Sequence, residues 1–221
     1  MADAKISALS ELALADVDKA ADYLVIVDTS AGTDKKILSG NVFGIGTARQ
    51  VPMVNAGATA LAYTNPITIT AKQASTSGST IDFTGIPAGV RRITIMLVGV
   101  STTGTGVMFV QLGDAGGPET SGYSCAAINV ASAGATVASN ETTAFLLDAG
   151  GVDTVIRHGS AVLNLVDAST FTWTFSSVYG REDSAVVSTG GGSKSLSATL
   201  TQVRVGTTDA FDAGAIAISY R

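Results

Sequence analysis

Few side chains in this 221-residue sequence have the chemistry of a catalytic or metal site. There is one histidine, His158 in the stretch VIRHGSA, and one cysteine, Cys125 in the stretch GYSCAAINV. A catalytic histidine needs a nucleophile and an orienting partner, and neither is evident near His158. One Cys and one His make no zinc site without several carboxylates. We therefore expect a structural or surface histidine, a buried free thiol, no metal and no cofactor; a pH-sensing role for His158 stays open.

Carboxylates are the other groups that could do chemistry, because hydrolysis of a glycosidic bond uses two of them across a cleft. The spacing of the acidic residues singles out no such pair. The candidates are Glu119, Glu141, Asp148, Asp153, Glu182 and Asp183. The sequence thus predicts a protein that is not an enzyme, with a depolymerase of surface polysaccharide as a less favoured alternative.

The composition favours strands and tight turns. Hydrophobic residues make up 46% of the chain and charged residues only 14%, with 25 glycines against 4 prolines. Val, Ile and Thr suit a pleated strand, and Gly supplies the positive φ that tight corners need. We expect an all-β fold.

Charge and apolar runs exclude several partners. The net charge is −5, and the basic residues from position 49 onward are scattered, so the basic stripe of a nucleic-acid-binding protein is missing. A single cysteine forms no intrachain disulfide. The polar start, MADAKISALSEL, lacks the apolar core of a signal peptide, and the longest apolar run, 93–100, is too short to cross a bilayer. We expect synthesis in a cytoplasm, no membrane insertion and no nucleic-acid partner.

The density of charge divides the chain into three parts. Residues 1–45 carry eleven charges and contain a loose helical pattern followed by a strand–turn–strand pattern at 23–40, which predicts a small α+β hairpin unit. Residues 46–75 are poor in charge and rich in small residues, which predicts an extended connector that packs against other chains. Residues 76–221 hold about ten strand candidates and predict a β-sandwich, jelly-roll-like in form.

Particular stretches of the third part predict its strands and corners. In 170–176 the aromatic residues alternate with Thr and Ser, which indicates a strand with one buried face. In 92–98 both faces become apolar after Thr94, which indicates burial on both sides. The stretch IPAG at 86–89 predicts a tight reversal, and TGGGSK at 189–194 predicts a mobile surface loop. Further corners are predicted at TTGTG, 102–106, and at the two DAGG stretches, 114–117 and 148–151.

Two parts of the chain resemble a known family. The front resembles the N-terminal segment of tail fibre and tail tip proteins of tailed bacteriophages, through Ile6-Ser7-Ala8-Leu9, the strand Tyr23 to Asp28 and the return Thr33 to Ile37. The main domain resembles C-terminal domains of phage fibres. Its matching pieces are 82–105, 110–123 and the close 203–221.

The resemblance implies a homotrimeric virion protein, receptor-binding and located in the tail, made in the cytoplasm of the host bacterium. Residues 1–45 would attach to other tail or baseplate proteins, 46–75 would form a trimeric stem, and 76–221 would contact a polysaccharide or an outer-membrane protein of the bacterial surface. A head fibre, capsid-decoration or baseplate protein without receptor binding is the alternative that stays open.

Five residues are candidates for receptor contact, because exposed aromatic and polar loop residues form adaptable binding surfaces. Tyr179, Arg181, Glu182 and Asp183 are predicted to share a loop after an aromatic-rich strand, and Tyr123 follows another loop. An ordinary role in a surface loop stays the alternative for each of them.

Overall fold

The computed structural model describes residues 23–28, 33–38, 51–54, 61–64 and 66–221, except 132–135, 151–154 and 183–184. The chain divides into two units, Met1–Pro66 and Ile67–Arg221. The boundary therefore lies at Ile67, nine residues before the predicted start of the third part at residue 76. The helical pattern predicted near the N-terminus lies outside the described residues.

The first unit contains two antiparallel strand pairs. Strand β1, Tyr23–Asp28, pairs with β2, Thr33–Leu38, so the hairpin predicted at 23–40 is confirmed. Strand β3, Val51–Val54, pairs with β4, Leu61–Thr64. The predicted connector 46–75 thus contains a strand pair of its own, and its last residues, from Ile67, belong to the second unit.

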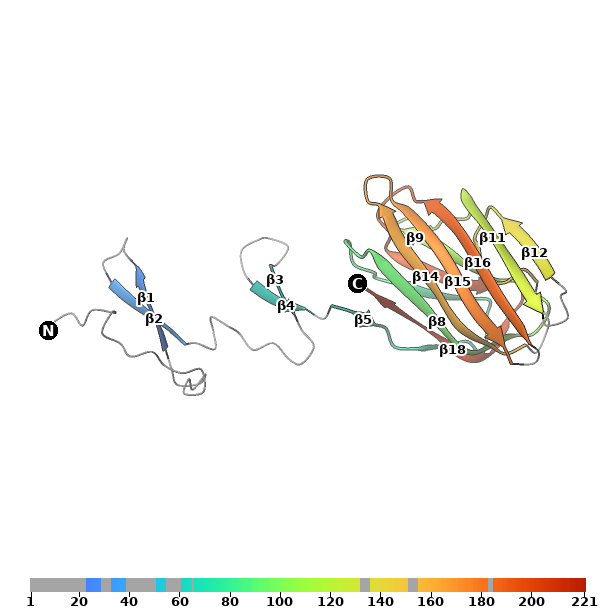
Figure 1. Cartoon of the computed structure of the whole chain (residues 1–221), viewed down its shortest axis with the longest axis horizontal. Coiled ribbons are helices and arrows are strands. Elements are labelled where there is room, and N and C mark those ends of the chain that lie inside the picture. The colour runs from blue at the N-terminus through green and yellow to red at the C-terminus, as the bar shows by residue number, and fades with distance from the viewer. Residues whose placement is uncertain are drawn as a thin grey trace. The chain divides into compact units, whose positions relative to one another are not determined.

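The second unit is a sandwich of two antiparallel sheets (Figure 1), which confirms the predicted all-β class. The large sheet has nine strands in the order β12-β11-β16-β15-β14-β8-β18-β5, and β6 also pairs with β18. Its strands are β5 Thr68–Ile69, β6 Gln73–Ala74, β8 Arg92–Thr102, β11 Tyr123–Ala131, β12 Thr136–Glu141, β14 Arg157–Asp167, β15 Thr172–Arg181, β16 Val186–Ser195 and β18 Phe211–Tyr220.

The small sheet has five strands in the order β10-β9-β17-β7, with β13 paired to β9. Its strands are β7 Thr80–Thr84, β9 Met108–Asp114, β10 Gly117–Pro118, β13 Phe145–Leu146 and β17 Gln202–Thr207. The reversal predicted at 86–89 is present, with Gly89 at φ +90°, and it joins β7 of the small sheet to β8 of the large sheet. It is therefore a corner between sheets, since β7 and β8 do not pair with each other.

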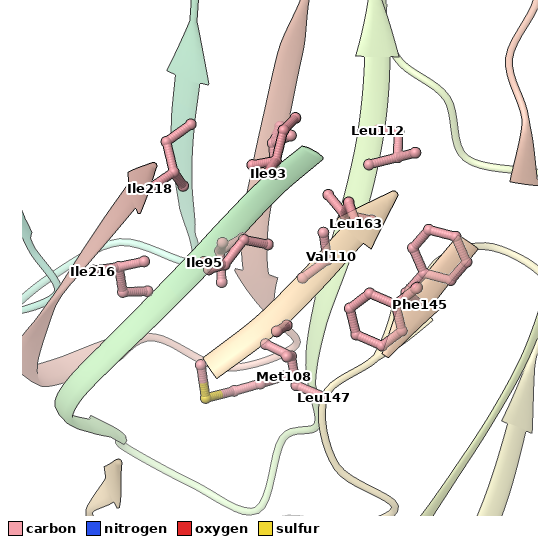
Figure 2. Packing of buried hydrophobic residues seen from close by; sticks show 14 of the residues in the cluster. Ile93, Ile95, Met108, Val110, Leu112, Phe145, Leu147, Leu163, Ile216 and Ile218 are labelled. Atoms are coloured by element: carbon pink, nitrogen blue, oxygen red, sulfur yellow. The ribbon is translucent and has the colours of Figure 1, made fainter. Parts of the chain in front are cut away.

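The core lies between the inner faces of the two sheets and is formed by alternate residues of each strand. Phe145 of the small sheet stacks on Phe175 of the large sheet, with ring centroids 4.7 Å apart. Figure 2 shows fully buried members of this core; they include Ile93, Ile95, Leu163, Ile216 and Ile218 of the large sheet and Met108, Val110 and Leu112 of the small sheet. The alternation of apolar residues in the sequence is what places them on one face.

Two predicted strands differ from the structure in an instructive way. In 170–176, Trp173 and Phe175 are buried as predicted, but Phe171 has φ +51° and ends the turn before β15. In 92–98, only one side is buried within the chain: Val98, on the opposite side, is 63% exposed. The prediction of burial on both sides is therefore wrong for the single chain.

The glycine-rich stretch TGGGSK is not a surface loop but part of β16, between β11 and β15. A Cβ on Gly190 would lie 2.7 Å from the carbonyl oxygen of Leu146, and one on Gly192 would lie 2.5 Å from that of Ser124. Glycine is required here because neighbouring backbone comes too close for any side chain. The sequence signal of a loop and that of a crowded strand are the same.

Both chain ends of the sandwich lie at one end of the large sheet. Thr68 of β5 pairs with Tyr220 of β18, one residue before Arg221. We call this the proximal end; it also holds the loops 85–91, 115–122, 168–171 and 196–201. The opposite, distal end holds the loops 103–107 and 208–210 together with Glu182, as the antiparallel strand order requires. No helix among the described residues has the length and apolar character to cross a membrane.

Candidate functional site

The distal end is a set of polar loops linked by hydrogen bonds. The backbone N–H of Thr103 donates to the carbonyl of Ala210 at 2.9 Å. The carboxylate of Asp209 accepts a hydrogen bond from the N–H of Gly106, and Asp212 accepts one from the hydroxyl of Ser101. These contacts hold the loop 103–107 against the turn 208–210 and give the distal end a defined surface.

His158 is a surface residue of this end, in agreement with its predicted structural or surface role. Its side chain is 50% exposed; Nδ1 accepts a hydrogen bond from the N–H of Gly99 at 3.2 Å, and Nε2 lies 3.8 Å from Oε2 of Glu182. Because Nδ1 is an acceptor, a neutral imidazole carries its proton on Nε2, towards the carboxylate. This pair is an exposed polar contact of the kind that contributes little to stability.

Cys125 is buried, as predicted, and its Sγ accepts the N–H of Leu146 at 3.1 Å. Burial raises the pKa of this thiol, which keeps it protonated and unreactive at neutral pH. Within the described residues, no three His, Cys, Asp or Glu side chains gather as metal ligands would.

The five residues predicted for receptor contact have four different outcomes, one of them shared by the two tyrosines. Glu182 is exposed at the distal end, and its N–H donates to the carbonyl of Ile156 at 3.0 Å. Arg181 is half-buried at the end of β15, so it belongs to a strand and not to the predicted loop. Asp183 lies outside the described residues.

The two tyrosines are core residues, so their prediction as exposed contacts is wrong. Tyr179 is 2% exposed and Tyr123 is 3% exposed, both on the inner face of the large sheet. The hydroxyl of Tyr123 accepts the N–H of Leu112 at 2.8 Å and donates to the carbonyl of Glu119 at 3.0 Å. Desolvation raises the pKa of both phenols. Strand alternation turned both rings inwards, and a tyrosine beside a loop carries no sequence signal of that direction.

A buried ion pair between the sheets was missed by sequence reasoning. Nε of Arg157, the first residue of β14, lies 3.1 Å from Oδ2 of Asp148, and the two side chains are 1% and 2% exposed. The N–H of Met108 donates to the other carboxylate oxygen at 3.1 Å, and Nη1 of Arg157 donates to the carbonyl of Val155. Burial raises the pKa of Asp148, an effect that the adjacent guanidinium opposes. The pair is satisfied and enclosed, which is typical of a structural role.

The two DAGG stretches have the same sequence, but their aspartates form different contacts. Asp114 stabilises a turn at the end of β9: Gly116 donates its N–H to Oδ1 at 2.7 Å, and the hydroxyl of Ser197 donates to Oδ2 at 2.6 Å. Asp148 instead points into the core towards Arg157. The difference lies in what each carboxylate faces after folding, and the four letters do not encode it.

A shallow depression of about 550 Å³ lies on the outer face of the large sheet, between β11, β12 and β16. Its floor is open because Gly191 has no side chain, and its rim is polar, with Ser124, Asn140, Glu141 and Ser193. Glu141 accepts the N–H groups of Thr142 and Thr143, and these hydrogen bonds lower its pKa. The depression holds one carboxylate, so it lacks the pair that glycoside hydrolysis requires.

Comparison of the chain with protein-family models, with curated proteins and with solved structures returned no match. The candidate site therefore stands on its own geometry: a polar distal end with Thr103, Thr105, His158 and Glu182 at its surface. Such a surface offers hydrogen-bond donors and acceptors to a polar partner. We find no arrangement there of a nucleophile, a base and an orienting group among the described residues.

Proposed function

We propose that the chain is a structural virion protein of a tailed phage, a trimeric tail fibre or tail tip protein that attaches the particle to the bacterial surface. Residues 1–45 dock onto other tail or baseplate proteins, the connector forms the trimeric stem, and the sandwich contacts a polysaccharide or an outer-membrane protein of the host. The resemblance of 5–44 and of 82–105 to phage fibre segments supports this reading.

One observation carries the proposal: the chain enters the sandwich at its proximal end. Ile67 precedes β5, and β5 pairs with the last residues of β18. The opposite, distal end of the sandwich is the end farthest along the strands from this connection, and its loops expose polar residues such as Thr103, Thr105 and Glu182. Binding loops positioned by a rigid β-scaffold are a common design for recognition.

In a trimer, each distal end needs only a weak contact with the host for the whole particle to bind firmly. Three copies of a distal end on one particle bind a dense surface together, and such linkage raises the apparent affinity by roughly 10²–10⁴-fold over one site. The few charges of the distal loops then need to provide only modest contact energy per copy.

The distal contact is tested by binding of the purified full-length chain to host cells. Thr105→Lys together with Glu182→Lys changes the exposed distal surface, and Thr199→Lys makes the same kind of change on the proximal loop 196–201. We expect the affinity of the distal variant for host cells to fall by about 10-fold or more, since contact residues dominate binding energy. The proximal variant should keep the affinity of the unmodified protein. Equal loss in both variants, or in neither, would contradict a distal contact.

The place of the protein in the particle is tested on virions. Deletion of residues 1–45 should abolish incorporation, and immunogold labelling should mark the tail. Labelling of the head, or labelling of the tail with no cell binding by the purified chain, would replace this proposal by the head fibre, decoration or baseplate alternative. Loss of capsule or lipopolysaccharide on addition of the purified protein would favour the depolymerase.

A further inference from the structure

The outer face of the large sheet is unlike an ordinary solvated surface. It is built from the outward positions in the central part of six adjacent strands, β11, β16, β15, β14, β8 and β18, without the outward residues at the strand ends. These positions are Ser124, Ala126, Ile128 and Val130 of β11; Val187, Thr189, Gly191 and Ser193 of β16; Thr174, Ser176, Val178 and Gly180 of β15; Ser160, Val162 and Asn164 of β14; Thr94, Met96 and Val98 of β8; and Ala215, Ala217 and Ser219 of β18. We call this set the uncharged face.

None of the positions of the uncharged face is Asp, Glu, Lys, Arg or His. For comparison, charged residues make up 14% of the whole chain, and a surface designed for solubility carries them at about 25–35% of its positions. Charged side chains begin at the borders, with Arg92 at the proximal end, Glu141 on the neighbouring strand β12, and His158, Glu182 and Asp212 at the distal end. Depletion of charge in the centre with charge at the rim is the composition of an interface core.

Exposed valines concentrate on this face. Val130 of β11 and Val187 of β16 lie directly opposite each other. Val178 of the next strand, β15, is a diagonal neighbour of Val187. These three side chains are 45%, 49% and 58% exposed, and Val98 on β8 is 63% exposed. Apolar side chains exposed together over several strands mark a surface that is covered in the working protein.

The size of the face suits a stable protein interface. Strands lie about 4.8 Å apart and residues about 3.4 Å apart along a strand, so six strands of about seven residues cover about 700 Å² of flat area. A standard interface buries about 800 Å² of accessible surface per partner, and a side-chain surface has more accessible area than its flat projection. The face is therefore large enough to hold an interface of standard size.

We propose that the uncharged face packs against further copies of this chain. The chain carries a net charge of −5, so the charged surfaces of two copies repel each other on average. An uncharged face is where copies approach without that penalty, and its small Ser, Thr, Ala and Gly side chains let two sheets pack at close range. This inference deepens the proposed function, because its trimeric form rests on that proposal.

The test is the solution mass of the full-length chain by light scattering on a sizing column. Three chains of 22.2 kDa make about 67 kDa, the expected mass of the unmodified protein. The double variant Val178→Asp, Val187→Asp brings like charges together on the face and should weaken association by on the order of 100-fold or more, to a 22.2 kDa monomer. Thr80→Asp, Thr84→Asp is the matched control on the outer face of the small sheet and should keep the 67 kDa mass.

A second measurement separates dissociation from misfolding. Trp173 is the one tryptophan and is 2% exposed, so an unchanged fluorescence spectrum shows that the sandwich of the variant is folded. In addition, a thiol introduced by Val178→Cys should be protected from a maleimide in the unmodified background, whereas one introduced by Thr84→Cys should react at once.

The outcomes distinguish this inference from the proposed function. A chain that is monomeric at every concentration overturns the inference. An oligomer whose mass and thiol protection do not change in the variants of the uncharged face also overturns it, but cell binding and virion incorporation then still decide the function. A dimer that the Asp variants dissociate supports the face as the contact and contradicts the trimeric fibre.

Discussion

The outer faces of the two sheets of the sandwich are built on opposite plans. On the small sheet, Arg204 of β17 and Asp82 of β7 form a two-pronged ion pair, with Nε to Oδ1 at 2.6 Å and Nη2 to Oδ2 at 2.8 Å, and both side chains are about one-third exposed. On the large sheet, the uncharged face has exposed valines instead. Both faces follow from the same strand alternation and differ in what occupies the outward positions.

The difference between the two outer faces indicates which of them stays in contact with solvent. A charged pair on a sheet face keeps its solvation and marks a surface that stays wet. A face without charge loses less solvation when another surface covers it, because neutral side chains are less strongly hydrated than charged ones. The apolar outward positions of β8, which the sequence alone would assign to the interior, belong to such a face. The small sheet is thus the outside of the assembly that we propose, and the large sheet its inside.

The largest effect on stability is expected for the charges that lie between the two sheets. Arg157→Met leaves the carboxylate of Asp148 buried without its partner, which costs about 3–5 kcal/mol of unfolding free energy. Urea unfolding followed by the fluorescence of Trp173, at constant protein concentration, measures it. The double variant Arg157→Met, Asp148→Asn should recover most of the loss, and a single variant as stable as the parent would show that the pair is not buried as described.

A smaller effect should separate the inward and outward glycines of β16. Gly192→Ala forces a Cβ to within 2.5 Å of the carbonyl oxygen of Ser124 and should cost about 1–3 kcal/mol. Gly191→Ala points outward, with its nearest neighbour 3.8 Å away, and should change stability by less than about 0.5 kcal/mol. The same urea experiment compares them; equal costs would contradict the alternation that defines the uncharged face.

The ion pair of the small sheet should contribute little. Arg204→Met removes an exposed pair, and such pairs contribute about 0.2–1 kcal/mol, less at high salt. The solution mass should not change, because this face is expected to stay in water. If Arg204→Met instead altered the mass while the Asp variants of the uncharged face did not, the roles of the two faces would be reversed.

The smallest effect is a change in acid sensitivity. The hydroxyl of Ser197 and the N–H of Gly116 hold the pKa of Asp114 below its ordinary value of 3.8. Because the folded pKa is the lower one, this stabilisation is present above the unfolded pKa and is lost as pH falls through the folded pKa. Ser197→Ala should raise the pKa of Asp114 towards 3.8, as an NMR titration would show. Ser169→Ala, which removes the hydroxyl that bonds to Asp167, should leave Asp114 unchanged.

Much of the fold could be predicted because alternation and turn chemistry are local. The hairpin of β1 and β2, the buried Trp173 and Phe175, and the corner at Gly89 all follow from neighbouring residues. The pairing of strands that are distant in the sequence could not be predicted, since it depends on contacts between residues far apart, such as Thr68 with Tyr220. The prediction of a surface loop at the glycine run of β16 was wrong for the same reason, because the backbone that crowds these glycines comes from β11 and from Leu146.

Less of the candidate site could be predicted. Glu182 lies at the surface where the sequence placed it, and Tyr123 and Tyr179 do not, because a one-residue difference in strand phase decides between solvent and core. His158 was recognised as a surface candidate, yet its neighbours Gly99 and Glu182 come from other strands and loops and were invisible in the sequence.

By itself, the sequence determined the class of this protein: Val, Ile, Thr and Gly in short alternating runs, with few charges, form antiparallel sheets. Only the tertiary structure decided which strands share a sheet, that Asp148 meets Arg157 between the sheets while Asp114 stays at a turn, and that the outward residues of six strands merge into one uncharged face. The physical reason is range. Backbone preference and side-chain alternation act over a few residues, whereas burial and charge pairing depend on neighbours that only folding brings together.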